Sequence, residues 1–154
     1  MLTGVEFHTG IPDPVAFVCR LLRKAQRQGH RAWVTADRQT LARLDEALWS
    51  FDALSFIPHV RVDLQPSGVS ADPARQLLLD RTPIWLAEQA VATEDRSLLI
   101  NVAADAPPDP TDWQRVIEIV AAEAEAAARG RARWRAWRDA GLQVMQHRMA
   151  ATDA

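Results

Sequence analysis

The hydrophobic positions of the chain fall into two kinds of segment, short apolar runs and longer stretches with helical spacing. The short runs predict strands at residues 2–8, 31–36, about 59–62, 82–87 and 97–103. Helical spacing predicts helices at 14–28, 38–48 and 112–120, and an Arg/Ala-rich helix ending near residue 140. Residues 64–82 read as a loop with at most a short helical turn at 71–79. This alternation predicts an α/β fold with a mostly parallel sheet of about five strands and helices on both faces.

Local signals set the limits of the first two helices. Asp13 is a suitable N-cap and is followed by a proline, which fits the first helical position; Gly29 is a natural stop. Asp37 can cap the second helix, whose apolar stripe consists of Leu41, Leu44 and Leu48. These signals place both helices between predicted strands, as a parallel sheet requires.

Length and composition indicate one domain. The chain has 154 residues, of which 48% are hydrophobic, enough for one buried core. We expect one α/β domain over residues 1–142 and a loosely ordered tail at 143–154. No apolar run approaches the ~18 residues of a membrane span, and no leader pattern is visible at the start. The sequence therefore predicts a soluble cytoplasmic protein that does not contact a membrane.

Charge is distributed unevenly along the chain. Residues 1–128 carry 12 basic and 18 acidic side chains, whereas residues 129–154 carry 6 basic and 2 acidic ones. A mildly acidic body with a basic C-terminal end predicts one localised anion-binding surface and disfavours a general nucleic-acid-binding protein.

Motifs for catalysis, cofactors and metals are missing. The six glycines are scattered singly, so there is no glycine-rich phosphate loop, and no G-x-S-x-G motif is present. The four histidines lack metal-ligand spacing, and Cys19 has no second cysteine beside it. His8 ends the first predicted strand, where it is either a general base or simply a polar residue, and Cys19 reads as a small core residue. We expect no intrinsic catalytic activity, no cofactor and no metal.

An aromatic segment, RLDEALWSFDALSFIPH at residues 43–59, is the first candidate site. Trp49 is offset from the leucine stripe of its helix, and Phe56 and Pro58 follow within ten residues. Aromatic residues at the rim of a core beside a proline-containing loop are suitable interface anchors. The alternative is that Trp49 and Phe56 only cover the edge of the sheet.

The Arg/Ala-rich helix, ARGRARWRAWRDAG at residues 128–141, is the second candidate site. Arg131, Trp134, Arg135 and Arg138 fall at positions 0, +3, +4 and +7 and form one stripe. Guanidinium groups beside an indole suit an anion attached to an aromatic or apolar group. A phosphate on arginine with a base on tryptophan also fits, as does a solvated face with two core tryptophans.

Together these segments resemble the chi subunit of bacterial DNA polymerase III, an accessory protein of the clamp-loader assembly. The resemblance rests on FVCRLLRKA, RLDEALWSFDALSFIPH, SLLINVA and VIEIV…ARGRARWRAWRDAGL, and it extends over most of residues 1–142. It implies a three-layer Rossmann-like sandwich that binds no nucleotide, in agreement with the missing phosphate loop.

The resemblance also implies a bridging role in DNA replication. One surface would bind the psi subunit, which tethers chi to the clamp loader, and Trp49, Phe56 and Pro58 match that surface. Another would bind the acidic, Phe-terminated C-terminal tail of the single-stranded-DNA-binding protein. The residues that match the second surface are Val120, Arg131, Trp134 and Arg135. DNA would then be contacted only indirectly.

The sequence is also compatible with a second function. The Arg/Trp helix could bind single-stranded nucleic acid directly, although the acidic body would repel an extended phosphate track. Binding of an acidic peptide that ends in phenylalanine, compared with its amidated form, separates the two functions.

Overall fold

A seven-stranded parallel sheet is the centre of the molecule. The computed structural model describes residue 2 and residues 4–51, 56–65, 68–69, 72–102, 105 and 112–149. The strands of the sheet are β1 (Gly4–Ile11), β2 (Ala32–Thr35), β3 (His59–Arg61), β6 (Ile84–Ala87), β7 (Leu98–Asn101), β8 (Arg115–Ala121) and β9 (Gln143–Arg148). They lie in the order β3-β6-β2-β7-β8-β1-β9, and every neighbouring pair is parallel. The predicted α/β class is confirmed, with more strands than the expected five.

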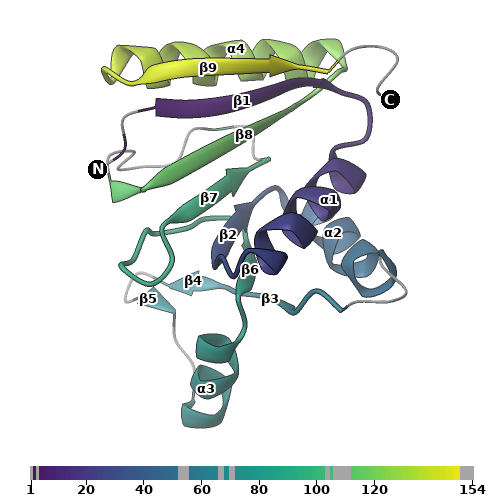
Figure 1. The fold of residues 1–154 in the computed structure, drawn as a ribbon, viewed down its shortest axis with the longest axis vertical. Helices are drawn as coiled ribbons and strands as arrows, with labels where there is room; N and C mark the ends of the chain where they lie inside the picture. The colour runs from purple at the N-terminus through teal and green to yellow at the C-terminus, as the bar shows by residue number, and fades with distance from the viewer. Residues whose placement is uncertain are drawn as a thin grey trace.

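Helices cover both faces of this sheet and complete three layers. In the described part of the chain these are α1 (Pro14–Arg27), α2 (Arg38–Ser50), α3 (Pro73–Arg81) and α4 (Ala124–Asp139). Figure 1 shows α1 and α2 together on one face and α4 running beside β9 at one end of the sheet. One buried cluster joins α1 and α2 to the sheet, and a second joins α3 and α4 to its opposite face.

The N-terminal helices begin where capping predicts. The Asp13 carboxylate accepts a hydrogen bond from the Ala16 amide at 3.2 Å, and Asp37 accepts one from the Thr40 amide at 2.7 Å. The predicted leucine stripe of α2 is buried against the sheet. Because each cap satisfies an amide that the helix itself cannot, these limits are fixed locally.

The helix predicted at 112–120 is wrong, because this segment contains β8. Val116, Ile117, Ile119 and Val120 are all buried, since β8 lies between β7 and β1 with a cluster on each face. Central strands of parallel sheets read as continuous apolar runs, and such a run also satisfies helical spacing. The β-branched residues in this segment favour the strand.

The loosely ordered tail expected from residue 143 is wrong for residues 143–148, which form β9. Gly141, at φ +88°, reverses the chain after α4, and Leu142 is buried. The strand then pairs with β1 from Gly4↔Gln143 to Thr9↔Arg148. Backbone pairing with β1 holds this edge strand in place. Because its side chains are mostly polar, they show no hydrophobic pattern that would predict a strand. Residues 150–154 lie outside the described residues.

The loop expected at 64–82 contains regular structure. It holds a two-stranded antiparallel pair, β4 (Leu64–Gln65) and β5 (Gly68–Val69), and the helix α3. Asp72 caps α3 by accepting a hydrogen bond from the Arg75 amide at 2.8 Å. Leu79 is the residue that α3 buries, which explains why no helical stripe was visible.

Candidate functional site

Helix α4 divides its arginines and tryptophans between two faces. Arg133 and Trp137 are buried against the sheet, while Arg131 and Arg135 are exposed. Trp134 is half-buried, and its ring lies 5.2 Å from that of Phe7 on β1. The predicted stripe therefore lies on the outer side of the helix, with Trp134 at its border with the core.

A glycine allows α4 to lie close against β8. A Cβ atom placed on Gly130 would be 2.6 Å from Cγ1 of Val120 and 2.9 Å from its Cγ2. Both distances are well below van der Waals contact, so only glycine fits at this crossing. The next residue on the helix is Arg131, which is thereby held beside Val120.

A pocket of about 340 Å³ opens beside this crossing. It brings together Val120, Arg131 and Trp134, three of the four residues predicted for the anion-binding surface. Arg135, the fourth, does not line it. The remaining lining residues come from β1, the end of β8, α4 and β9: Phe7, Thr9, Gly10, Ala121, Ala122, Ala127, Gly130, Gln146 and Arg148.

The chemistry of the pocket suits an apolar group that carries a negative charge. Phe7, Val120 and Trp134 supply apolar and aromatic surface, and Arg131 supplies a guanidinium group. None of the described residues that line the pocket is acidic. An arginine fork binds a carboxylate through two charge-assisted hydrogen bonds, and the aromatic surface excludes water around it.

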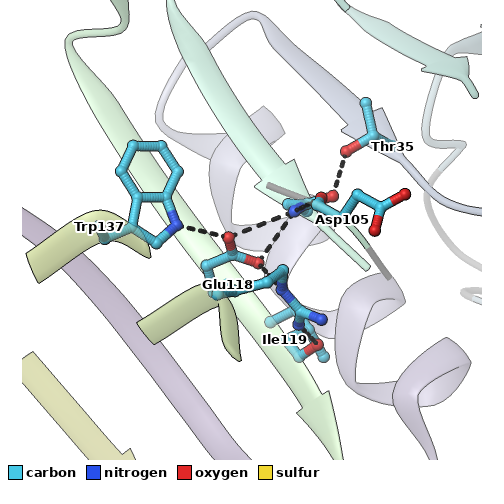
Figure 2. A network of polar contacts seen from close by, with 7 residues as sticks. Thr35, Asp105, Glu118, Ile119 and Trp137 are labelled. Carbon is cyan, nitrogen blue, oxygen red and sulfur yellow. Dashed lines mark hydrogen bonds and ion pairs between the residues drawn. The ribbon is translucent and has the colours of Figure 1, made fainter. Parts of the chain in front are cut away.

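A buried polar network fixes the inner face of α4 (Figure 2). The Glu118 carboxylate accepts hydrogen bonds from Arg133 Nε at 3.0 Å, Trp137 Nε1 at 2.8 Å and Asn101 Nδ2 at 3.0 Å. Thr35 Oγ1 donates to Asn101 Oδ1 at 2.6 Å. Burial raises the pKa of Glu118, and the ion pair with Arg133 and the hydrogen bonds from Trp137 and Asn101 oppose that rise.

Sequence reasoning missed Glu118 because the segment around it was assigned to a helix. A single acid inside the apolar run VIEIV is the available signal, since a buried carboxylate needs a partner. Arg133 and Trp137 supply that partner from α4. The network thus sets the rotation of the helix and turns Arg131 outward.

The aromatic surface formed by Trp49, Phe56 and Pro58 lies near β3, the opposite edge of the sheet. The rings of Trp49 and Phe56 stack with centroids 5.2 Å apart and remain 62% and 52% exposed. Pro58 is half-buried beside them. Neither ring belongs to the two buried clusters, so the pair is available for contact.

His59 packs against this aromatic surface from the protein interior. Its buried ring lies 5.0 Å from that of Trp49, and its Nε2 lies 2.9 Å from Oδ1 of Asp45 on α2. Its Nδ1 lies 2.8 Å from the carbonyl oxygen of Ile57. The two polar contacts fix the imidazole and thereby the position of the exposed indole.

Cys19 and His8, the two isolated candidates for catalytic residues, are both packed into the fold. Burial raises the pKa of Cys19 to about 11, so the side chain is held as a thiol within the α1 core. His8 stacks on His147 of β9 at 4.9 Å, and burial is the largest cause of its lowered pKa. Cys19 thus packs within the core, and His8 packs between the rings of Phe17 and His147.

Two further features concern metals and membranes. Among the described residues, no group of three or more His, Cys, Asp and Glu side chains is arranged to hold a metal ion. Likewise, no helix in the described ranges is long and apolar enough to cross a membrane.

The fold resembles that of other solved structures. The C-terminal domain of Saccharomyces cerevisiae Dbp5 superimposes with a TM-score of 0.58 over 99% of this chain and 93% of that one. The two sequences are 12% identical, so this likeness concerns the architecture only.

Comparison of sequences, unlike comparison of folds, identifies a protein family. The family model for the DNA polymerase III chi subunit, HolC, matches residues 2–145. The DNA polymerase III subunit chi of Pseudomonas aeruginosa is 32% identical over 96% of this chain and 98% of that protein. The Escherichia coli subunit chi is 28% identical over 88% of this chain and 85% of that protein. This chain therefore belongs to the family of DNA polymerase III chi subunits.

Proposed function

We propose that this chain is a non-catalytic bridging subunit that links two partners in the cytoplasm during DNA replication. Its family gives it an accessory role in the polymerase III assembly. The pocket beside α4 would bind the C-terminal tail of the single-stranded-DNA-binding protein, and the aromatic surface near β3 would bind psi. Neither role requires a cofactor or a metal.

The observation that carries tail binding is the convergence of Val120, Arg131 and Trp134 on one pocket. The terminal carboxylate of a phenylalanine fits the Arg131 guanidinium, and its ring fits the surface of Val120 and Trp134. Upstream acidic residues of the tail would face the exposed Arg135, which lies on α4 outside the pocket lining, where a charge mainly raises the association rate. The binding is therefore expected to weaken with salt.

Tail binding is tested by fluorescence anisotropy with a labelled acidic peptide that ends in phenylalanine. Arg131→Ala is expected to weaken binding about ten- to a hundred-fold, because a charge-assisted contact contributes roughly 1.5–3 kcal/mol. Arg131→Lys should restore only part, since lysine lacks the planar fork. Equal affinity of wild type and Arg131→Ala would refute the proposal.

The same titration separates the nucleic-acid alternative. Direct binding of single-stranded DNA predicts tight binding of a bare oligonucleotide and a loss of affinity with each arginine removed. Tail binding predicts instead that amidation of the peptide terminus lowers affinity and that the oligonucleotide binds weakly. Titrations at two salt concentrations compare the two ligands.

Psi binding is supported by the exposed, stacked pair of Trp49 and Phe56. Trp49→Ala and Phe56→Ala are expected to weaken association with psi by about 2 kcal/mol or more each. Tail affinity should stay unchanged, because the pocket lies at the other end of the sheet. Leu77→Ala on α3, an equally exposed apolar residue, is the control. Unfolding of both aromatic variants would show instead that these residues serve the core.

A further inference from the structure

The pocket beside α4 contains a second arginine, which comes from the edge strand β9. Arg148 lines the pocket together with Arg131, although 17 positions of sequence separate them. Both side chains are exposed, and neither makes an ion pair with any described residue. By contrast, Arg129 and Arg133 on the same helix pair with Glu125 and Glu118.

The register of β9 explains how Arg148 reaches the pocket. Arg148 pairs with Thr9 of β1, and alternate residues of a strand share a face, so Gln146 and Arg148 lie on the same side. Gln146 Nε2 donates to Thr9 Oγ1 at 3.0 Å, which holds this part of the edge strand. All three residues line the pocket that α4 covers.

The charge of the pocket is unbalanced. Arg131 and Arg148 are the charged side chains among its described lining residues. An anionic ligand would balance the positive charge that the two guanidinium groups place beside the apolar surface. A ligand with one or more carboxylates near an apolar group satisfies both features of the pocket.

We propose that Arg148 is a second carboxylate-binding residue of this pocket, acting with Arg131 from the opposite element. The inference rests on the proposed binding of the acidic, Phe-terminated tail. It assigns to β9 a part in recognition. The carboxylate is either the terminal one or that of an acidic side chain near the end of the peptide.

The experiment combines protein variants with peptide variants. Affinities of wild type, Arg131→Gln, Arg148→Gln and Arg138→Gln are measured for the free-acid peptide, its amide, and a peptide with asparagine in place of its aspartates. Arg148→Gln is expected to weaken binding of the free-acid peptide about ten-fold. Arg138→Gln removes the same charge from an exposed position that does not line the pocket and should change little.

The peptide variants show which carboxylate of the peptide Arg148 binds. If Arg148 holds the terminal carboxylate, amidation abolishes the difference between wild type and Arg148→Gln. If it holds an acidic side chain, the asparagine peptide abolishes that difference. Either result supports the proposal. Thermal unfolding of Arg148→Gln at the wild-type temperature shows that β9 remains in place.

Three outcomes overturn the inference, and they differ in what else they affect. A loss for Arg131→Gln without one for Arg148→Gln, or an equal small loss for Arg148→Gln and Arg138→Gln, rejects the role of Arg148 alone. Absence of wild-type binding to any peptide rejects the proposed function of the pocket as well.

Discussion

The two faces of α4 carry the same residue types and put them to opposite uses. On the inner face, Arg133 and Trp137 are buried and both bind the Glu118 carboxylate. On the outer face, Arg131 and Trp134 line an open pocket without an acidic residue among its described lining. Two residues of separation along the chain thus distinguish an arginine used for stability from one proposed for binding.

The difference lies in the neighbours and not in the helix. Glu118 on β8 faces the inner side, where Arg133 neutralises it in a site closed to water. The outer side meets the uncharged residues of β1 and the polar edge strand β9. Substitutions on the inner face should therefore change folding, and those on the outer face should change binding.

Arg133→Ala should have the largest effect on stability. It leaves the buried Glu118 carboxylate without its ion-pair partner, which costs about 3–5 kcal/mol. Urea denaturation followed by circular dichroism measures the loss. The double variant Arg133→Met with Glu118→Leu should be more stable than Arg133→Ala, since no buried charge then remains unpaired. A stability of Arg133→Ala equal to that of Arg131→Ala would contradict the division of the two faces.

Gly130→Ala should have an intermediate effect and involve both faces. Alanine normally stabilises a helix interior by roughly 0.5–1 kcal/mol relative to glycine. Here the added methyl group collides with Val120, so we expect a destabilisation of about 1–3 kcal/mol. Because Val120 lines the pocket, tail affinity should fall too.

A coupling measurement tests this contact. Gly130→Ala combined with Val120→Ala should lose less stability than the two single variants together, as expected for residues that touch. Additive losses would show that the close approach of α4 and β8 does not limit residue 130.

The buried Glu118 carboxyl should make the free energy of unfolding depend on pH, and we expect this effect to be smaller than that of Gly130→Ala. Burial raises the pKa of this carboxyl in the folded protein, so the folded state keeps the proton to higher pH than the unfolded chain does. The resulting stabilisation is complete below the unfolded value of about 4.3 and is lost as the pH rises through the folded pKa. Denaturation at several pH values, with Glu118→Gln and the exposed Glu125→Gln as comparison, measures this slope. The contribution of Glu118 to the slope should disappear in Glu118→Gln and persist in Glu125→Gln.

Arg138→Ala should have the smallest effect. The side chain is exposed, and its contact with the neighbouring Asp139, at 3.5 Å, is an exposed pair. Such pairs contribute about 0–1 kcal/mol. Thermal unfolding should be unchanged, and stopped-flow measurements should show at most a slightly slower association of the tail peptide. A loss of affinity as large as that of Arg131→Ala would extend the binding surface beyond the pocket.

Much of the fold followed from local sequence signals. Asp13 and Asp37 started their helices as caps, and Leu41, Leu44 and Leu48 marked the buried face of α2. The short apolar runs gave β2, β6 and β7 within one or two residues. These signals depend on residues within a turn or two of one another, so they can be found without knowledge of the rest of the chain.

The candidate sites were predictable to different degrees. Helical spacing grouped Arg131 with Trp134 and left Trp137 free to pack inward, in agreement with the structure. It also added Arg135, which does not line the pocket. Periodicity gives the angle of a residue around its helix, but the distance of that residue from the opposing surface depends on what packs there.

Only the tertiary structure decided the rest. The strand at 115–121 needed neighbours on both sides to be distinguished from a helix, and β9 exists because β1 offers it a free edge. Glu118 contacts Arg133, and Arg148 lines the same pocket as Arg131, because distant segments of the chain pair with one another. The sequence by itself determined local conformation and which faces are apolar, since both arise from near neighbours. Which charges are neutralised and which stay available depends on contacts between residues far apart in the chain, and those contacts form only when it folds.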